Sequence, residues 1–186
     1  MRITGGAARS IQLRTLDLPE LRPATDQMRQ AVFNSLASSI PGCQFLDLFA
    51  GCGAVGLEAG SRGASSGVFV ERHPKLAALI RQNIAAVCKS AQVDFASFHL
   101  HEGDVFSFQP VEASFDIVFC DPPYALILGN EERLFDLGLR ALKPGGLFLW
   151  EHPAEVPLDK AKGFEFLKRL GGKSPRAPNT GVFRKL

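Results

Sequence analysis

The run from Phe115 to Cys120 constrains the fold of this 186-residue chain most strongly. Five of its six residues are apolar, a composition typical of a β-strand that is buried on both faces. Asp121, Pro122 and Pro123 follow directly, and proline cannot continue a sheet ladder because it has no N–H. Asp121 is therefore expected at the carboxyl end of a central strand. In open α/β sheets, this is the edge where ligands bind.

Strand-like and helix-like segments alternate on both sides of this run. The expected strands are 43–49, 67–71, a segment within 93–101, 115–120 and 147–150, and the expected helices are 54–62, 74–89 and 130–142. Two last strand-like runs, at 163–170 and 181–186, flank a loop rich in Gly, Pro and Lys and predict an antiparallel hairpin. The sequence therefore predicts an α/β fold: a doubly wound, mostly parallel seven-stranded sheet that ends in an antiparallel hairpin.

The helix expected at 130–142 has a start signal and a stop signal. Asn130 is a good N-cap residue, and Glu131 and Glu132 follow in the first turn, where acidic side chains favour the helix dipole. The sequence Lys-Pro-Gly-Gly at 143–146 is expected to break the helix before the next strand.

The first 42 residues precede the alternating pattern. Period-two alternation on both sides of Gly5-Gly6 predicts a small two-stranded β arm within residues 2–14. Thr25 or Asp26 is placed to cap a helix that Pro41-Gly42 ends. We expect a single domain made of the arm (1–22), a linking helix (23–42) and a ligand-binding core (43–186).

The net charge of +2 is unevenly distributed. Residues 1–29 hold five Arg against three acids, residues 30–155 hold eight Lys and Arg against fourteen acids, and residues 156–186 hold eight against two. Basic ends on an acidic middle favour a polyanionic partner held by the termini, but an ordinary solvated surface has the same composition. The arginines of the arm likewise either contact RNA phosphates or solvate an edge; they are Arg2, Arg9, Arg14 and Arg22.

Several classes of site are not supported. The four cysteines are far apart and form no C-x-x-C pair, so we expect reduced core residues, and Cys120 is expected to be buried in its strand and not a nucleophile. His99 and His101 share one face of a predicted strand, but no third ligand stands at a familiar spacing, and no metal site is expected. No apolar run approaches the roughly 20 residues that span a bilayer, which predicts a cytoplasmic protein.

A glycine-rich turn stands between the first core strand and the helix after it. Gly51, Gly53 and Gly56 form a G-x-G-x-x-G pattern, and Glu71 lies at the end of the next strand, where a carboxylate can bind ribose hydroxyls. This spacing alone fits an NAD-dependent oxidoreductase equally well. Asp47, four residues before Gly51, favours a cationic ligand over a pyrophosphate.

The segment that starts at Asp47, Asp-Leu-Phe-Ala-Gly-Cys-Gly, resembles the first motif of class I methyltransferases that use S-adenosylmethionine (SAM). The resemblance implies that Asp47, Gly51 and Gly53 surround the methionine part of SAM. It further implies that Glu71 binds the ribose and that Asp104 accepts a hydrogen bond from the adenine amino group. Asp104 also suits a simple turn after a strand.

Asp121-Pro122-Pro123-Tyr124 resembles the motif with which such enzymes hold an exocyclic amino group of a nucleic-acid base. This amine is a poor nucleophile because its lone pair is delocalised into the ring. A carboxylate of Asp121 and the carbonyl of Pro122, accepting from both N–H bonds, would aim the lone pair at the methyl group. Tyr124 would stack on the flipped base. A strand-end Asp before a proline turn is the simpler alternative.

The motifs together are similar to those of the bacterial RsmD family, the 16S rRNA guanine-N2 methyltransferases. The resemblance implies a class I methyltransferase fold with a small N-terminal β extension, SAM as cofactor, and action on a guanine of 16S rRNA in the small ribosomal subunit. We expect a monomer. The alternatives are a DNA adenine-N6 or cytosine-N4 methylase, an NAD-dependent oxidoreductase and a non-catalytic assembly factor. The segments that carry the resemblance are 22–26, Arg29, 33–34, 46–59, 69–72, 121–124 and 142–146.

Overall fold

Seven strands form one sheet in the computed structural model, which describes residues 1–16, 26–153, 161–171 and 179–186. The strands are β1 (Gln44–Asp47), β2 (Ser66–Glu71), β3 (Phe98–Glu102), β4 (Phe115–Cys120), β5 (Leu142–His152), β6 (Phe164–Gly171) and β7 (Asn179–Lys185). The α-helices are α1 (Asp26–Ser35), α2 (Ala54–Ser61), α3 (Pro74–Ala91), α4 (Tyr124–Ile127) and α5 (Glu131–Ala141), and short 3-10 helices cover Phe95–Ser97 and Val105–Ser107.

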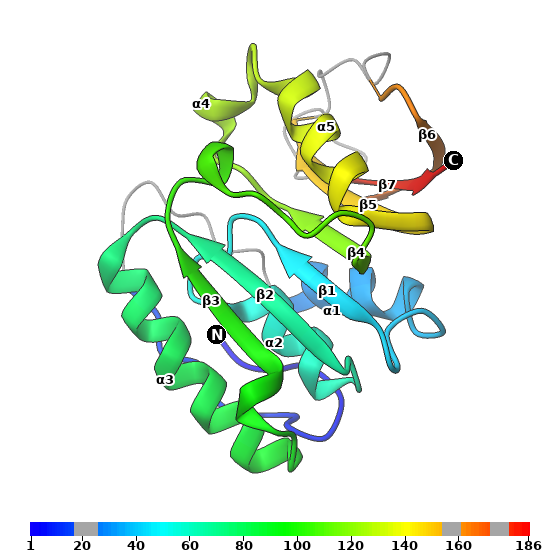
Figure 1. Cartoon of the computed structure of the whole chain (residues 1–186). Helices are drawn as coiled ribbons and strands as arrows, with labels where there is room; N and C mark the ends of the chain where they lie inside the picture. The colour runs from blue at the N-terminus through cyan, green and yellow to red at the C-terminus, as the bar shows by residue number, and fades with distance from the viewer. Residues whose placement is uncertain (17–25, 154–160, 172–178) are drawn as a thin grey trace.

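The strand order is β3-β2-β1-β4-β5-β7-β6 (Figure 1). The first five strands are parallel, while β7 pairs antiparallel with both β5 and β6. The carboxyl ends of β1 to β5 therefore meet at one edge of the sheet. The predicted doubly wound, mostly parallel sheet with a C-terminal antiparallel pair is confirmed.

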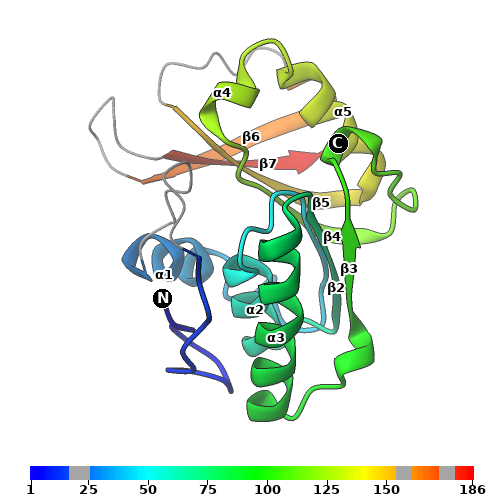
Figure 2. The same cartoon turned by 90° about the vertical axis from the view of Figure 1, so that its left-hand side faces the viewer.

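Helices cover both faces of the sheet (Figure 2). Side chains of α1, α2 and α3 pack with Phe45, Phe69 and Phe119 on one face. Side chains of α4 and α5 pack with Val118 and Trp150 on the other. Consecutive residues of β1 and of β4 are apolar and buried. Since consecutive residues of a strand point to opposite faces, both faces of these strands are apolar, as predicted for buried parallel strands.

The junction between α5 and β5 differs from the prediction. The helix ends at Ala141 because Leu142 is already extended, at φ −78° and ψ 143°, and it begins β5. Residues 143–146 do not separate a helix from a strand; they form a bulge within β5, between the pairs Phe115–Leu142 and Ile117–Leu147. Asn130 does occupy the N-cap position of α5, but its side chain donates to the carbonyl of Leu126 at 3.0 Å and caps nothing.

The region before β1 also differs in detail. The predicted β arm is a single antiparallel bridge between Arg2 and Gln12, although Ile3 and Leu13 are buried in the core. The linking helix is shorter than predicted, since α1 ends at Ser35. The predicted cap at Thr25, the family-like residues 22–25 and the Gly/Pro/Lys-rich loop at 172–178 lie outside the described residues.

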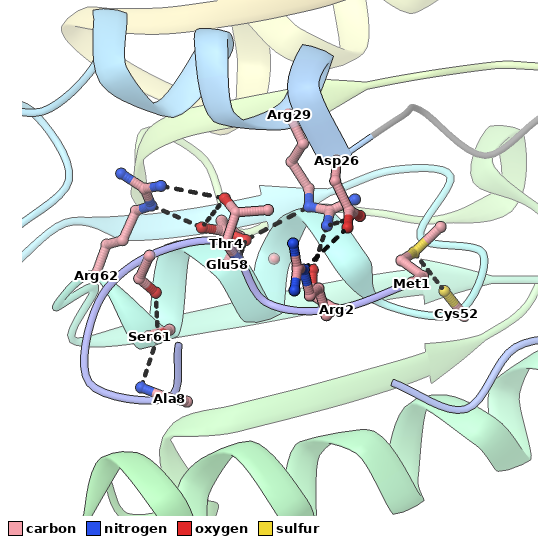
Figure 3. A network of polar contacts seen from close by, with 12 residues as sticks. Met1, Arg2, Thr4, Ala8, Asp26, Arg29, Cys52, Glu58, Ser61 and Arg62 are labelled. Carbon is pink, nitrogen blue, oxygen red and sulfur yellow. Dashed lines mark hydrogen bonds and ion pairs between the residues drawn. The ribbon is translucent and has the colours of Figure 1, made fainter. Parts of the chain in front are cut away.

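Buried polar contacts hold the arm to α2 (Figure 3). Glu58 accepts hydrogen bonds from the backbone N and the hydroxyl of Thr4, each at 2.8 Å. The same carboxylate pairs with Arg29 at 3.4 Å and with Arg62 at 2.8 Å. One turn later, the hydroxyl of Ser61 accepts from Ala8 N at 2.9 Å. The arm is therefore part of the folded core.

Candidate active site

Four carboxylates gather at the carboxyl edge of the sheet. Asp47 ends β1, Glu71 ends β2, Asp121 follows the last residue of β4, and Glu151 lies one residue before the end of β5. Each acid lies two residues after a core residue that faces α1, α2 and α3, so all four side chains leave the sheet on that face. These core residues are Phe45, Phe69, Phe119 and Leu149. The fold thereby brings together three of the predicted acids and adds Glu151.

The glycine turn follows Asp47 directly. Gly51 and Gly53 have positive φ angles of 57° and 82°, and Gly53 is the N-cap of α2. A Cβ at Gly51 would meet nothing within 4 Å, so the turn is open on that side. Gly56 has a different purpose: a Cβ there would lie 2.4 Å from Phe69 and 2.6 Å from Phe45. It allows α2 to pack closely on the sheet.

Glu71 fixes the shape of this turn. Its Oε2 accepts from Gly51 N and its Oε1 from His73 N, both at 2.8 Å. The carboxylate therefore ties the glycine turn to the start of α3 while lying at the edge where a ribose would be. Asn83 adds a second tie from α3: this buried amide donates to Cys52 O at 2.9 Å and accepts from Arg14 N at 2.8 Å.

Asp47 lies beneath the turn, buried, with its Oδ2 accepting from Gly56 N at 3.1 Å. Burial raises its pKa to about 7; the hydrogen bond from Gly56 opposes this shift, and the charge of Glu71 adds to it. Within the described residues, no Lys, Arg or His forms an ion pair with Asp47. A cationic ligand above the turn would favour its charged form.

Asp104 lies farther along the same edge, after β3. Its Oδ1 accepts from Phe106 N at 2.8 Å and caps the 3-10 helix at 105–107, as in the turn that the sequence also allowed. Its Oδ2 lies 3.9 Å from Arg72 Nη1. About half of the side chain is exposed, so it remains accessible to a ligand.

Asp121 is half-buried at the end of β4. Burial, followed by the charges of Glu151 and Asp47, holds its pKa well above the usual value for a carboxyl group. Pro122 is buried behind it, and Pro123 leads into α4, whose first residue is Tyr124. Tyr124 is 40% exposed and Leu128, just after α4, is 77% exposed, so apolar surface is accessible in the segment that follows Asp121.

Sequence reasoning missed Glu151. It is half-buried, and burial raises its pKa. The signal in the sequence was present but weak: an acid follows the apolar run 147–150, just as Asp121 follows 115–120. Only the pairing of β4 with β5 shows that the two acids are neighbours.

The predictions for the other candidate residues can be stated briefly. Cys120 is buried, and burial raises its pKa well above the usual value, so it is a core residue as expected. His99 and His101 are exposed on the edge strand β3. Among the described residues, no three His, Cys, Asp or Glu side chains are grouped so that they could hold a metal ion. Every helix in these ranges is too short or too polar to cross a membrane.

The open side of Gly51 and the carboxylates around it fit SAM, whose sulfonium and ammonium groups are cationic and whose ribose carries two hydroxyls. An NAD pyrophosphate would instead lie against Asp47 and Glu71. The chemistry of the edge thus selects between the two cofactors that the glycine spacing left open.

Comparisons with known proteins agree with this geometry. The family model described as "Conserved hypothetical protein 95" matches residues 1–174. The "Ribosomal RNA small subunit methyltransferase D" of Haemophilus influenzae is 31% identical over 170 residues, covering 90% of this chain and 86% of the relative. The protein of that name from Escherichia coli K12 is 36% identical over 128 residues, or 67% of this chain and 60% of the relative.

Solved structures give the same result for the fold. The structure of Escherichia coli yhhF superposes with a TM-score of 0.81 at 28% identity, and the match covers 100% of this chain and 97% of that one. Since the family model extends over nearly the whole chain, the chain belongs to the RsmD family of class I methyltransferases, whose cofactor is SAM.

Proposed function

We propose that this chain transfers a methyl group from SAM to the exocyclic N2 amine of a guanine in 16S rRNA of the small ribosomal subunit. The observation that carries the proposal is the position of Asp121. Its half-buried carboxylate stands at the end of β4, beside the cofactor edge formed by Asp47 and Glu71. A carboxylate at this point can hold an amine that has been turned toward a methyl donor.

The cofactor residues proposed from the sequence divide into two groups. Gly51 provides open backbone along which the methionine part can lie, Gly53 provides the positive φ angle that the turn needs, and Asp47 beneath them offers a negative charge. Glu71 and Asp104 are assigned to the ribose hydroxyls and to the adenine amino group. Each of these carboxylates already holds a backbone N–H, so it is fixed in position before the ligand arrives.

In the proposed reaction, Asp121 and its neighbours orient the amine and accept its proton. SAM supplies a methyl group on a positively charged sulfur. The carboxylate of Asp121 and the carbonyl of Pro122 accept the two N–H bonds of the amine, so that its lone pair points at the methyl carbon. As the N–C bond forms and the C–S bond breaks, the nitrogen becomes positive and releases one proton to Asp121. A raised pKa makes this carboxylate a better proton acceptor.

The residues that follow Asp121 are suited to hold a flipped base. A base inside a helix cannot present its amine to Asp121, so it must leave its stack. Tyr124, exposed at the start of α4, offers an aromatic face on which the flipped base can stack. Leu128, also exposed, extends the apolar surface beyond it.

The choice of 16S rRNA rests on the relatives that carry the name of a small-subunit rRNA methyltransferase. The charge distribution supports it, since the basic residues at both ends can bind phosphates. Phosphate contacts position a protein without identifying a sequence. Selection of one guanine by a chain of 186 residues therefore calls for the preformed shape of an assembled or partly assembled subunit, bound by a monomer.

The test uses purified protein with labelled SAM. Small subunits from a strain that lacks this gene should be methylated far better than naked duplex DNA, and nucleoside mass spectrometry should identify N2-methylguanine. The rate should fall steeply as salt increases, because phosphate contacts release counterions. Formation of N6-methyladenine or N4-methylcytosine on DNA would overturn the proposal.

A further inference from the structure

The two acids at the ends of β4 and β5 are direct neighbours. The last pairs between these strands are Phe119–Leu149 and Cys120–Trp150, and the next residues are Asp121 and Glu151. Adjacent strands are about 4.8 Å apart, so side chains on the same face reach adjacent atoms of one bound ring. The alternation of the strands places both carboxylates on the face shared by Phe119 and Leu149.

This pair is not neutralised within the described part of the chain. None of the described residues donates a hydrogen bond to Asp121 or Glu151, and none forms an ion pair with either. Two half-buried carboxylates that face each other repel, and the charge of Glu151 acts on Asp121 directly. Such an arrangement is costly unless a ligand brings hydrogen-bond donors to both groups.

Resting on the function proposed above, we propose that Glu151 determines base specificity by accepting the N1–H of the target guanine while Asp121 accepts an N2–H. The two donors are adjacent on the Watson–Crick edge of guanine, and they point in the same direction. A pair of carboxylates on neighbouring strands is complementary to this donor–donor edge.

The same pair opposes the other amino bases. Adenine presents its N6 amine beside N1, and cytosine presents its N4 amine beside N3; both ring nitrogens are acceptors without a proton. With the amine on Asp121, the ring nitrogen would direct its lone pair at the carboxylate of Glu151. A site that leaves a charged acceptor facing another acceptor rejects the ligand strongly. Asp-Pro-Pro-Tyr alone cannot make this distinction, because Asp121 contacts only the amine.

The structure offers a defined test because one base analogue separates the two contacts. 2-Aminopurine keeps the N2 amine of guanine but has an acceptor at N1. We would reconstitute small subunits whose 16S rRNA carries either guanine or 2-aminopurine at the position found to be methylated. Methyl transfer at saturating SAM is then measured for the wild type, for Glu151→Gln and for Glu112→Gln, an exposed acid that serves as the charge-matched control.

The wild type should prefer guanine over 2-aminopurine by about 100-fold or more, the upper range for a good paired contact to a base. Glu151→Gln should transfer to guanine about 10- to 100-fold more slowly, and its preference should fall below about tenfold because the Gln amide can donate to N1. Glu112→Gln should match the wild type. SAM affinity should stay within about twofold in both variants, which verifies that the site is folded. If Glu151→Gln fails to fold, Glu151→Asp replaces it and should retain the preference for guanine.

The possible failures are distinguishable. If the wild type forms no N2-methylguanine on guanine subunits, the proposed function is wrong. If it forms N2-methylguanine but accepts 2-aminopurine equally, or if Glu151→Gln keeps the wild-type preference, the role of Glu151 is wrong while the function stands. Equal use of 2-aminopurine by the wild type would mean that no residue contacts N1–H, and a preference that survives in Glu151→Gln would mean that another group contacts it.

Discussion

Two groups of carboxylates in this protein differ in whether described cations neutralise them. Glu58 in α2 is fully buried, and its oxygens lie 2.8 Å from Arg62 and 3.4 Å from Arg29 (Figure 3). Asp121 and Glu151, at the edge of the sheet, face each other, and no described cation pairs with them. The described residues supply the positive charge for Glu58 and supply none for Asp121 and Glu151.

The difference separates an acid that serves the fold from acids that are candidates for binding a ligand. A buried carboxylate is tolerated when it is paired and hydrogen-bonded, as Glu58 is. Carboxylates that remain unpaired reduce stability, and they are retained where a ligand provides donors or positive charge. Burial raises the pKa of both Asp121 and Glu151, as expected for acids that pair with no cation among the described residues.

The largest effect is expected from breaking the paired cluster. Glu58→Ala should lower the free energy of unfolding by about 3–5 kcal/mol, because the buried Arg29 would lose the charge of Glu58, although it keeps its ion pair with Asp26, and Thr4 N would lose its acceptor. Urea denaturation measures this loss. Glu165→Ala, which removes the exposed ion pair with Arg184, is the control and should cost about 0–1 kcal/mol. Folded Glu58→Ala should keep its SAM affinity; if it loses SAM binding but not stability, the contrast between the clusters is wrong.

The next effect concerns the unpaired cluster. Asp121→Asn should reduce methyl transfer by about 100- to 1000-fold, since Asn can accept one N–H but can neither offset the developing charge nor take the proton. Single-turnover kinetics at saturating SAM measures it, and SAM affinity should be nearly unchanged. Asp116→Asn, at the other end of β4, is the control and should keep most of the activity. Activity of Asp121→Asn within tenfold of wild type would remove Asp121 from the mechanism.

A smaller effect is expected at the cofactor edge. Glu71→Ala should weaken SAM binding by about 10- to 100-fold, because it removes a charge-assisted contact to the ribose worth roughly 1.5–3 kcal/mol. The loss of the acceptor for Gly51 N would loosen the turn as well. Calorimetric titration with SAM measures the change. Glu102, which is paired with Glu71 in register at the exposed end of β3, provides the matched control: Glu102→Ala should bind SAM like the wild type.

The sequence was sufficient for most of the fold. Apolar runs bounded by Gly and Pro predicted seven strands in the parallel-then-antiparallel arrangement that the structure has. The junction at 141–147 was wrong because Lys-Pro-Gly-Gly has the local chemistry of a stop signal. Pairing of Leu142 with Phe115 in β4 is a tertiary effect, and it extends β5 back to Leu142.

Sequence reasoning can propose an acid as a site residue when the acid belongs to a local motif. It cannot propose an acid that is near the site only because two strands pair. Asp47 and Asp121 were proposed because each stands before a glycine turn or a proline turn at a strand end, and Glu71 because it ends the strand that follows the glycine turn. Glu151 has no such neighbour, and its closeness to Asp121 depends on the order β4-β5. Glu58 was missed for the same reason, since its partner Arg29 lies 29 positions earlier in the chain.

The effect that is smallest near neutral pH is a pH dependence of SAM binding that comes from Asp47. Burial raises the pKa of this carboxyl to about 7 in the free protein, so it is largely protonated below that pH. Because cationic SAM favours the charged form, binding below pH 7 must release a proton, and affinity should fall by up to about tenfold per pH unit as the pH decreases from 7 to 5. Folding has the opposite sign: between the unfolded value of 3.8 and about 7 the folded state binds more protons, so the contribution of Asp47 to stability decreases as the pH rises.

Titrations with SAM from pH 5 to 7.5 measure the pH dependence of SAM binding. Asp47→Asn keeps an acceptor for Gly56 N and should show a flatter profile. Equal slopes in the two proteins would mean that a cation of the chain already pairs with Asp47, as Arg29 and Arg62 pair with Glu58. The contrast between the paired acid and the cofactor acids would then be wrong.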